Sequence, residues 1–179
     1  VSDAVEMFLP VLDGLDYMHQ KNILHRDIKP ANIYLTEKRK TILLDFGAAR
    51  QAVQERSQSM TAILTPGFAP WEQYFRKGKQ GAWTDVYACA ATLYRMVTGQ
   101  CPPDGMERFY EDDLVPVWNL ASGIDPAVAL GIMSGLEVRI ETRTKTAREF
   151  ANIPQLHKRG EQQHVIKNTK AHGRKGPTP

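Results

Sequence analysis

The chain has 179 residues, of which 42% are hydrophobic and 24% charged, the composition of an ordinary globular protein with one core. Its two cysteines, Cys89 and Cys101, have no metal-ligand partners at short spacing, which argues against a disulfide scaffold and a zinc site. No apolar stretch approaches the length of a membrane span, and the first residues do not resemble a secretory signal. We therefore expect a cytoplasmic protein with no membrane segment.

The expected elements follow one another from a long N-terminal helix. Apolar residues recur at helical spacing over 2–20, and two short apolar runs at 33–35 and 41–44 flank a polar turn, which predicts a small β-hairpin. The stretch 48–64 is rich in Gln, Ser, Thr and Ala and is predicted to be a long functional loop. Further helices are predicted at 84–97, 125–136 and 145–151. The pattern predicts a mainly α fold with a hairpin, in one domain at 1–152.

The last part of the chain differs in composition from the rest. Between residues 153 and 179 the acid Glu161 stands against six basic residues, Lys158, Arg159, Lys167, Lys170, Arg174 and Lys175. Because this basic segment lacks interleaved aromatic residues, we expect a disordered tail and assign it no nucleic-acid partner.

The strongest chemical signal is the sequence HRDIKPAN at 25–32, followed after the predicted hairpin by DFG at 45–47. Asp27, Asn32 and Asp45 supply side-chain oxygens on loops that the hairpin would bring together. Hard divalent cations prefer such ligands, and a sparse set suits a magnesium ion that arrives with a nucleotide. With the cation of Lys29 close to Asp27, the set suits phosphoryl transfer.

These motifs resemble those of eukaryotic-type serine/threonine protein kinases, most closely the bacterial members, and the resemblance covers residues 1 to about 152. It implies the fold of a kinase C-terminal lobe, ATP and Mg²⁺ as cofactors, and protein serine or threonine as the substrate. It further implies that Asp27 is the catalytic base, that Asn32 and Asp45 are the metal ligands, and that Lys29 lies beside the transferred phosphate.

The sequence TPGFAPWE at 65–72 resembles the end of the kinase activation segment. The resemblance implies that Thr65 forms hydrogen bonds near Asp27 and Lys29. It also implies that Thr65, Pro66 and Gly67 form part of the site that binds the protein substrate.

Three further residues are implied to be structural. Glu72 is expected in a buried ion pair with a distant arginine, for which Arg143 is preferred over its rival Arg139. Asp85 is expected to hold the catalytic loop by accepting backbone hydrogen bonds, although an aspartate near a helix start is often only a cap.

Arg26 suggests regulation, because in such kinases this arginine pairs with a phosphate on the activation loop. Thr61 is the preferred acceptor. His25 and Phe46 resemble residues that stack through the core of an active kinase, and ordinary core positions would be buried in the same way.

The sequence does not contain the glycine-rich loop, strand lysine and paired glutamate of the kinase N-terminal lobe. We therefore expect the missing lobe to be a necessary partner and the chain alone to have no measurable kinase activity. A non-catalytic kinase-like binding module and a small-molecule phosphotransferase are the alternative functions.

Overall fold

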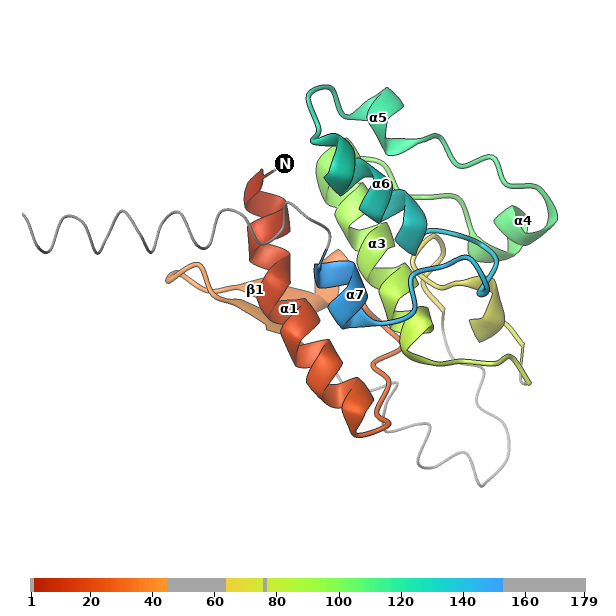
Figure 1. Cartoon of the computed structure of the whole chain (residues 1–179), viewed down its shortest axis with the longest axis horizontal. Helices are drawn as coiled ribbons and strands as arrows, with labels where there is room; N and C mark the ends of the chain where they lie inside the picture. Colours follow the sequence, from red (N-terminus) through yellow and green to blue (C-terminus); the bar gives the residue numbers. More distant parts are fainter. Residues whose placement is uncertain (1, 45–63, 76, 153–179) are drawn as a thin grey trace, which may run out of the picture.

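Helices dominate the part of the chain that the computed structural model describes, residues 2–44, 64–75 and 77–152 (Figure 1). The predicted mainly helical fold with one small antiparallel hairpin is confirmed. In chain order the elements are α1 (Ser2–Gln20), the 3₁₀ turn η1 (Pro30–Asn32), β1 (Ile33–Leu35), β2 (Thr41–Leu43), a second 3₁₀ turn η2 (Trp71–Gln73), α3 (Ala82–Thr98), α4 (Gly105–Tyr110), α5 (Val117–Leu120), α6 (Pro126–Gly135) and α7 (Ala147–Ala151).

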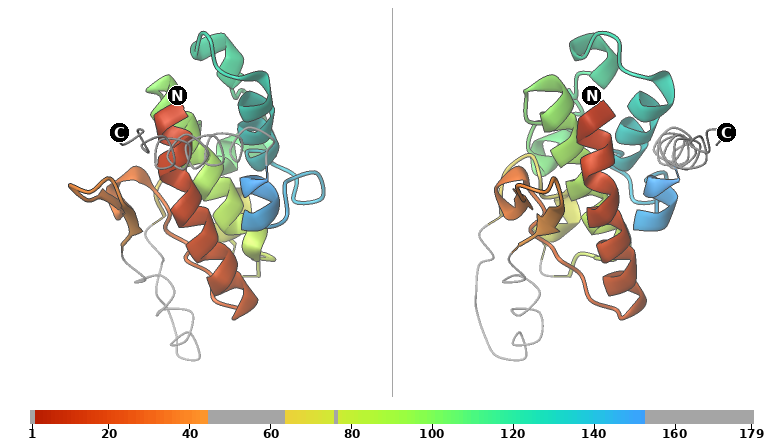
Figure 2. Two further views of the ribbon diagram at one scale, coloured as in Figure 1. Left: turned by 60° about the vertical axis from the view of Figure 1, so that its left-hand side comes forward. Right: turned by 90° about the vertical axis from the view of Figure 1, so that its left-hand side faces the viewer.

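Helix α3 forms the centre of the fold. Every residue from Thr84 to Tyr94 is buried, so this helix is covered on all sides. Figures 1 and 2 show α1, α6 and α7 arranged around it, and these helices contact it. The core therefore lies around one buried helix, and residues near the start of that helix are shielded from water.

Helix α1 connects this core to the hairpin. Its buried side chains Phe8, Leu12 and Leu15 join the core, and α1 also packs against β2. In the hairpin, Ile33 is paired with Leu43 and Tyr34 with Ile42. The backbone N–H of Leu44 donates to the carbonyl of Asn32 at 2.7 Å, so the ladder continues to the end of the HRDIKPAN segment. The hairpin thereby fixes one end of that segment.

The structure differs from the sequence-based expectation mainly in its short elements. Helices α3 and α7 begin within two residues of the predicted starts. The six-residue α4 and the four-residue α5 were not predicted, because helices this short do not produce a sustained apolar period. None of the described helices is both long enough and apolar enough to cross a bilayer.

Two helical glycines should respond in opposite ways to alanine. A Cβ at Gly14 of α1 would meet no atom within 4 Å, so Gly14→Ala should raise the free energy of unfolding by about 0.5–1 kcal/mol through lower backbone entropy of the unfolded chain. A Cβ at Gly135 would lie 2.6 Å from the Cβ of Ala90, so Gly135→Ala should lower it by about 1–3 kcal/mol. Urea denaturation of both variants measures these changes, and equal effects would contradict the α3–α6 packing.

Candidate functional site

A buried carboxylate of α3 accepts hydrogen bonds from the backbone at the start of the segment 25–27. Asp85 is fully buried, and its oxygens accept from the backbone N–H of His25 at 2.9 Å and of Arg26 at 2.8 Å. The Nε2 atom of His19, at the end of α1, lies 2.8 Å from the same carboxylate. Arg26 has a positive φ of 67°, an uncommon conformation for a non-glycine residue that these contacts stabilise. The loop is thus attached to the core through Asp85.

Residues other than Asp85 cap the N-terminus of α3. Gly81 is the N-cap, and its N–H donates to the hydroxyl of Thr84 at 3.1 Å. The carboxylate of Asp85 is therefore available to accept hydrogen bonds from the distant loop, and the expected backbone contacts are present. The alternative interpretation of Asp85 as a helix cap is not what the structure shows.

Replacing Asp85 by asparagine should loosen the loop specifically. One accepting oxygen becomes an N–H₂ group that faces a backbone donor, so the free energy of unfolding should fall by about 2–3 kcal/mol. Hydrogen exchange at the amides of His25 and Arg26 should accelerate as well. Asp125→Asn is the matched control, because Asp125 caps α6 and asparagine caps a helix equally well. Unchanged exchange at both amides would contradict this role.

Three polar side chains meet at the anchored loop, two from the loop itself and one from the segment that begins at Thr65. The ammonium Nζ of Lys29 lies 3.0 Å from Asp27 Oδ1 and donates to the hydroxyl of Thr65 at 2.9 Å. That hydroxyl in turn donates to Asp27 Oδ1 at 3.5 Å. The side chains of Asp27 and Lys29 are 28% and 24% exposed, so a reactant can reach them. The expected contacts of Thr65 with Asp27 and Lys29 are present.

The side-chain amide of Asn32 is oriented by Asp27. Its Nδ2 group donates to the Asp27 carbonyl at 2.7 Å and to Asp27 Oδ2 at 2.9 Å. Because both partners are acceptors, the nitrogen must face them, which leaves Asn32 Oδ1 as an outward acceptor. An amide oxygen beside a carboxylate is a donor set that suits magnesium. Among the described residues no group of three His, Cys, Asp or Glu side chains could hold a metal, and the expected set relies on an amide and on Asp45.

The segment that begins at Thr65 is fixed by close packing. Gly67 has a φ of 80°, and a Cβ there would lie 2.5 Å from the carbonyl oxygen of Pro102, so only glycine fits. Further along, the amide of Gln73 donates to the carbonyl of Arg26 at 3.0 Å. Residues 65–73 are therefore tied both to the loop after α3 and to the loop that carries Asp27.

Glu72 and Arg143 form the expected ion pair, with 2.6 Å between Nη1 and Oε1 and both side chains fully buried. Thr84 donates its hydroxyl to Glu72 at 3.1 Å. Arg143 also donates to the carbonyls of Glu137 and Val138, at 2.7 and 2.9 Å. The rival partner, Arg139, is exposed. This pair joins the segment 65–73 to the chain just before α7.

The guanidinium of Arg143 also lies 5.0 Å from the ring centroid of Tyr87. Burial raises the pKa of Tyr87, and the nearby cations of Arg108 and Arg143 lower it by less. The phenol is therefore neutral at physiological pH and serves as a packing surface and acceptor between the two arginines.

The structure brings most of the predicted residues together. One segment, which ends in the 3₁₀ turn η1, carries five of them: His25, Arg26, Asp27, Lys29 and Asn32. This segment contacts Asp85 and Thr65, and Pro66 and Gly67 follow Thr65 in the chain. Glu72 and Arg143 form a separate, buried ion pair. The predictions for Asp45, Phe46 and Thr61 concern residues outside the described part of the chain.

Two residues of the site were not predicted, His19 and Gln73. His19 ends an amphipathic helix, and Gln73 follows the TPGFAPWE segment, so neither belongs to a motif. Gln73 contacts the loop directly at Arg26, 47 residues away, whereas His19 contacts Asp85, the residue of α3 that holds the loop, 66 residues away. No local signal identifies such contacts.

Comparisons with known proteins point in one direction. Residues 2–116 match the family model described as protein kinase domain. The chain is 34% identical to the serine/threonine-protein kinase PknA of Nostoc sp. over 87% of this chain and 28% of that protein. It is 30% identical to the probable serine/threonine-protein kinase PknB of Corynebacterium glutamicum, over 83% of this chain and 25% of that protein.

A solved structure shares the fold. The structure titled "PpkA-294 apo form" matches with a TM-score of 0.70 and 36% identity, over 80% of this chain and 50% of that chain. The chain spans about a quarter of the length of the curated relatives it matches. Its elements correspond to one part of those proteins.

Proposed function

Since this chain belongs to the protein kinase family, we propose that it forms the C-terminal lobe of a serine/threonine protein kinase and carries its catalytic loop. In this proposal residues 1–152 are the lobe and 153–179 a basic tail. The observation that carries the proposal is the triangle of Asp27, Lys29 and Thr65, held on a loop that the buried Asp85 anchors. A binding module has no need for this arrangement of a carboxylate, a cation and a hydroxyl.

Each group of the triangle has a role in the proposed reaction. Asp27 Oδ1 accepts the proton of the attacking serine or threonine hydroxyl, and Lys29 neutralises charge on the transferred phosphoryl group. Thr65 holds both side chains in position through its hydroxyl. The backbone of Pro66 and Gly67, which is fixed against Pro102, supports the substrate chain beside them.

ATP and Mg²⁺ are the proposed cofactors. Asn32 Oδ1 faces away from Asp27 and is available as a ligand, and Asp45 is the proposed second ligand. When bound, the metal would neutralise charge on the phosphates. The orientation of Asn32 depends on Asp27, so these two residues act as a unit.

Regulation by phosphorylation of Thr61 is proposed as well, with Arg26 as the residue that binds the phosphate. Within the described residues the buried Nε of Arg26 has no hydrogen-bond partner. A phosphate is a strong ligand for a guanidinium group, and its binding would satisfy this donor.

A cytoplasmic location is proposed as well, since a reducing compartment suits the two free thiols of Cys89 and Cys101.

The proposal is tested by phosphoryl transfer from labelled ATP. The chain joined to a nucleotide-binding lobe of the family should label serine and threonine of a protein, and the chain alone should label nothing. Phosphoamino-acid analysis of the product identifies the acceptor. Labelling of tyrosine only, or of a small molecule such as an aminoglycoside and no protein, would overturn the proposal, and so would the absence of any transfer by the joined protein.

A further inference from the structure

Arg95 presents a cation beside the segment that begins at Thr65. It lies in the last turn of α3 and is exposed, and its Nη1 atom donates to Sγ of Cys101 at 3.5 Å. The Cβ of Cys101 in turn lies 3.6 Å from the position that a Cβ on Gly67 would take. Cys101 and Pro66 are both exposed. Exposed residues therefore connect the segment that begins at Thr65 with the guanidinium group.

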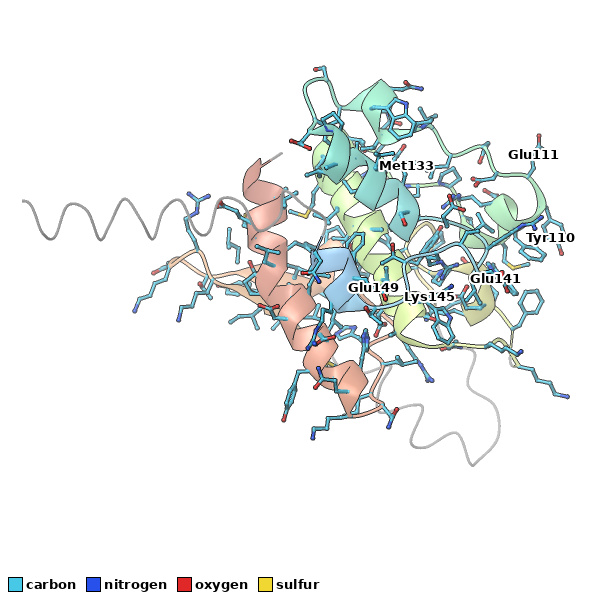
Figure 3. All side chains as sticks on the ribbon, viewed as in Figure 1. Tyr110, Glu111, Met133, Glu141, Lys145 and Glu149 are labelled. Atoms are coloured by element: carbon cyan, nitrogen blue, oxygen red, sulfur yellow. The ribbon has the colours of Figure 1, made fainter. Side chains whose placement is uncertain are left out.

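The charge of Arg95 has no acidic partner in the described part of the chain, where no ion pair engages its guanidinium group. Asp104 is the nearest acid in the sequence, and its two carboxylate oxygens accept from the N–H of Met106 and the hydroxyl of Tyr74. Figure 3 shows the more distant Glu111 pointing outward at the edge of the molecule. Since a thiol sulfur is only a weak acceptor, the guanidinium group retains the capacity to bind an anion.

A basic residue in the last turn of a helix often has a purely structural role. It interacts favourably with the helix dipole and can donate to the final carbonyls of its own helix. In α3 the final turn is closed instead by the backbone N–H of Gly99, which donates to the Arg95 carbonyl at 2.9 Å. The Arg95 side chain donates to Cys101 on the loop that follows the helix. Helix capping therefore does not account for the position of this side chain.

The proposed function brings the protein substrate close to Arg95. The attacking hydroxyl of the substrate meets Asp27, and the backbone of Pro66 and Gly67 supports the substrate chain. An extended chain advances about 3.3 Å per residue, so a side chain within about five residues of that hydroxyl can reach past Gly67. A guanidinium group binds a carboxylate through paired, charge-assisted hydrogen bonds. An acidic side chain of the substrate is the group that suits Arg95.

We propose that Arg95 is a specificity-determining residue, which selects protein substrates with an acidic side chain close to the serine or threonine that accepts the phosphate. This inference rests on the proposed function, because it concerns the substrate of the same site. Arg95 does not touch the reacting atoms, so it should act on KM more than on kcat. A basic side chain at the same substrate position is repelled, and acidic and basic substrates should therefore differ most.

The test is a positional scan of substrate peptides with the chain joined to a nucleotide-binding lobe. Each peptide has one serine in alanine and glycine, with a single aspartate, asparagine or lysine at one of the five positions on either side. At one of these positions aspartate should raise kcat/KM about threefold over asparagine, and lysine should lower it about threefold. The difference should shrink as the salt concentration rises.

Variants of the joined protein assign this preference to Arg95. Arg95→Gln should bring the three peptides within about twofold of one another, and Arg95→Glu should favour lysine over aspartate. Cys101→Asp supplies a carboxylate beside the guanidinium group and should also weaken the preference, whereas the uncharged Cys101→Asn should keep it. Lys38→Glu is the matched control, because it reverses the charge of an exposed residue in the hairpin turn and should leave the preference unchanged.

A binding measurement with the chain alone provides a readout that needs no catalysis. Fluorescence anisotropy of a labelled peptide with alanine in place of serine should give a Kd about threefold lower for aspartate than for asparagine, and Arg95→Gln should remove the difference. Circular dichroism should show every variant folded, as the exposure of the changed residues implies.

The outcomes separate this inference from the proposed function. Transfer to the serine peptides with equal kcat/KM for aspartate and lysine would overturn the inference alone. A preference for aspartate that persists in Arg95→Gln, or that Lys38→Glu weakens to the same extent, would overturn it as well. The absence of transfer to every peptide would overturn the proposed function and this inference with it.

Discussion

Replacing Arg143 by methionine should lower the free energy of unfolding by about 3–5 kcal/mol. The change leaves the carboxylate of Glu72 buried with the hydroxyl of Thr84 as its remaining donor among the contacts described above. It also removes the donors to the carbonyls of Glu137, Val138 and Trp83. Urea denaturation with linear extrapolation measures the loss.

Two further variants test whether the loss comes from the uncompensated charge. Glu72→Met combined with Arg143→Met removes both charges and should be less destabilising than Arg143→Met alone. Arg148→Met breaks the ion pair with Asp16, in which the arginine side chain is 66% exposed, and should cost at most about 1 kcal/mol. If Arg143→Met lowers the free energy of unfolding no more than Arg148→Met does, the buried pair does not stabilise the fold.

Replacing Asp27 by asparagine should reduce kcat for phosphoryl transfer by roughly 10²–10⁴-fold in the chain joined to a nucleotide-binding lobe. The amide cannot accept the proton of the attacking hydroxyl. Its oxygen can still accept from Lys29 and Thr65, whereas the hydrogen bond from Asn32 Nδ2 to the second carboxylate oxygen is lost. Because the Asp27 side chain is 28% exposed, stability should change by less than about 1 kcal/mol. Steady-state kinetics and urea denaturation of the same variant separate the two quantities.

The control for this variant is Asp13→Asn, which changes an exposed carboxylate of α1 and should leave kcat unaltered. The proposed role of Asp27 requires that KM for the protein substrate changes little, since the residue acts on the transferred proton. A variant with full kcat would show that another group accepts the proton.

The sequence predicted the elements that have a long period or a recognisable motif. Helices α1 and α3 have many turns of apolar residues, and the hairpin has two short apolar strands around a polar turn. The contacts of Asp85 with His25 and Arg26, and the pairing of Glu72 with Arg143, were expected from the resemblance to kinases. Periodicity and composition alone would have left Asp85 as a helix cap.

The features that the sequence did not predict depend on packing between distant segments. Arg108 lies in a short stretch rich in charged residues, which indicates a solvated loop, yet the residue is buried between Tyr87 and Asp112. The choice between Arg139 and Arg143 likewise depends on which side chain the fold turns inward. Such burial is decided by tertiary contacts that no local pattern encodes.

The hydrogen bonds that Asp85 accepts from His25 and Arg26 affect how the proposed reaction site forms. Since the carboxylate belongs to the central helix, the uncommon backbone conformation at Arg26 is established when this lobe folds, before nucleotide or substrate arrives. Ligand binding then needs no free energy to order that part of the chain. A nucleotide-binding lobe would therefore meet a loop whose backbone conformation at Arg26 is already set.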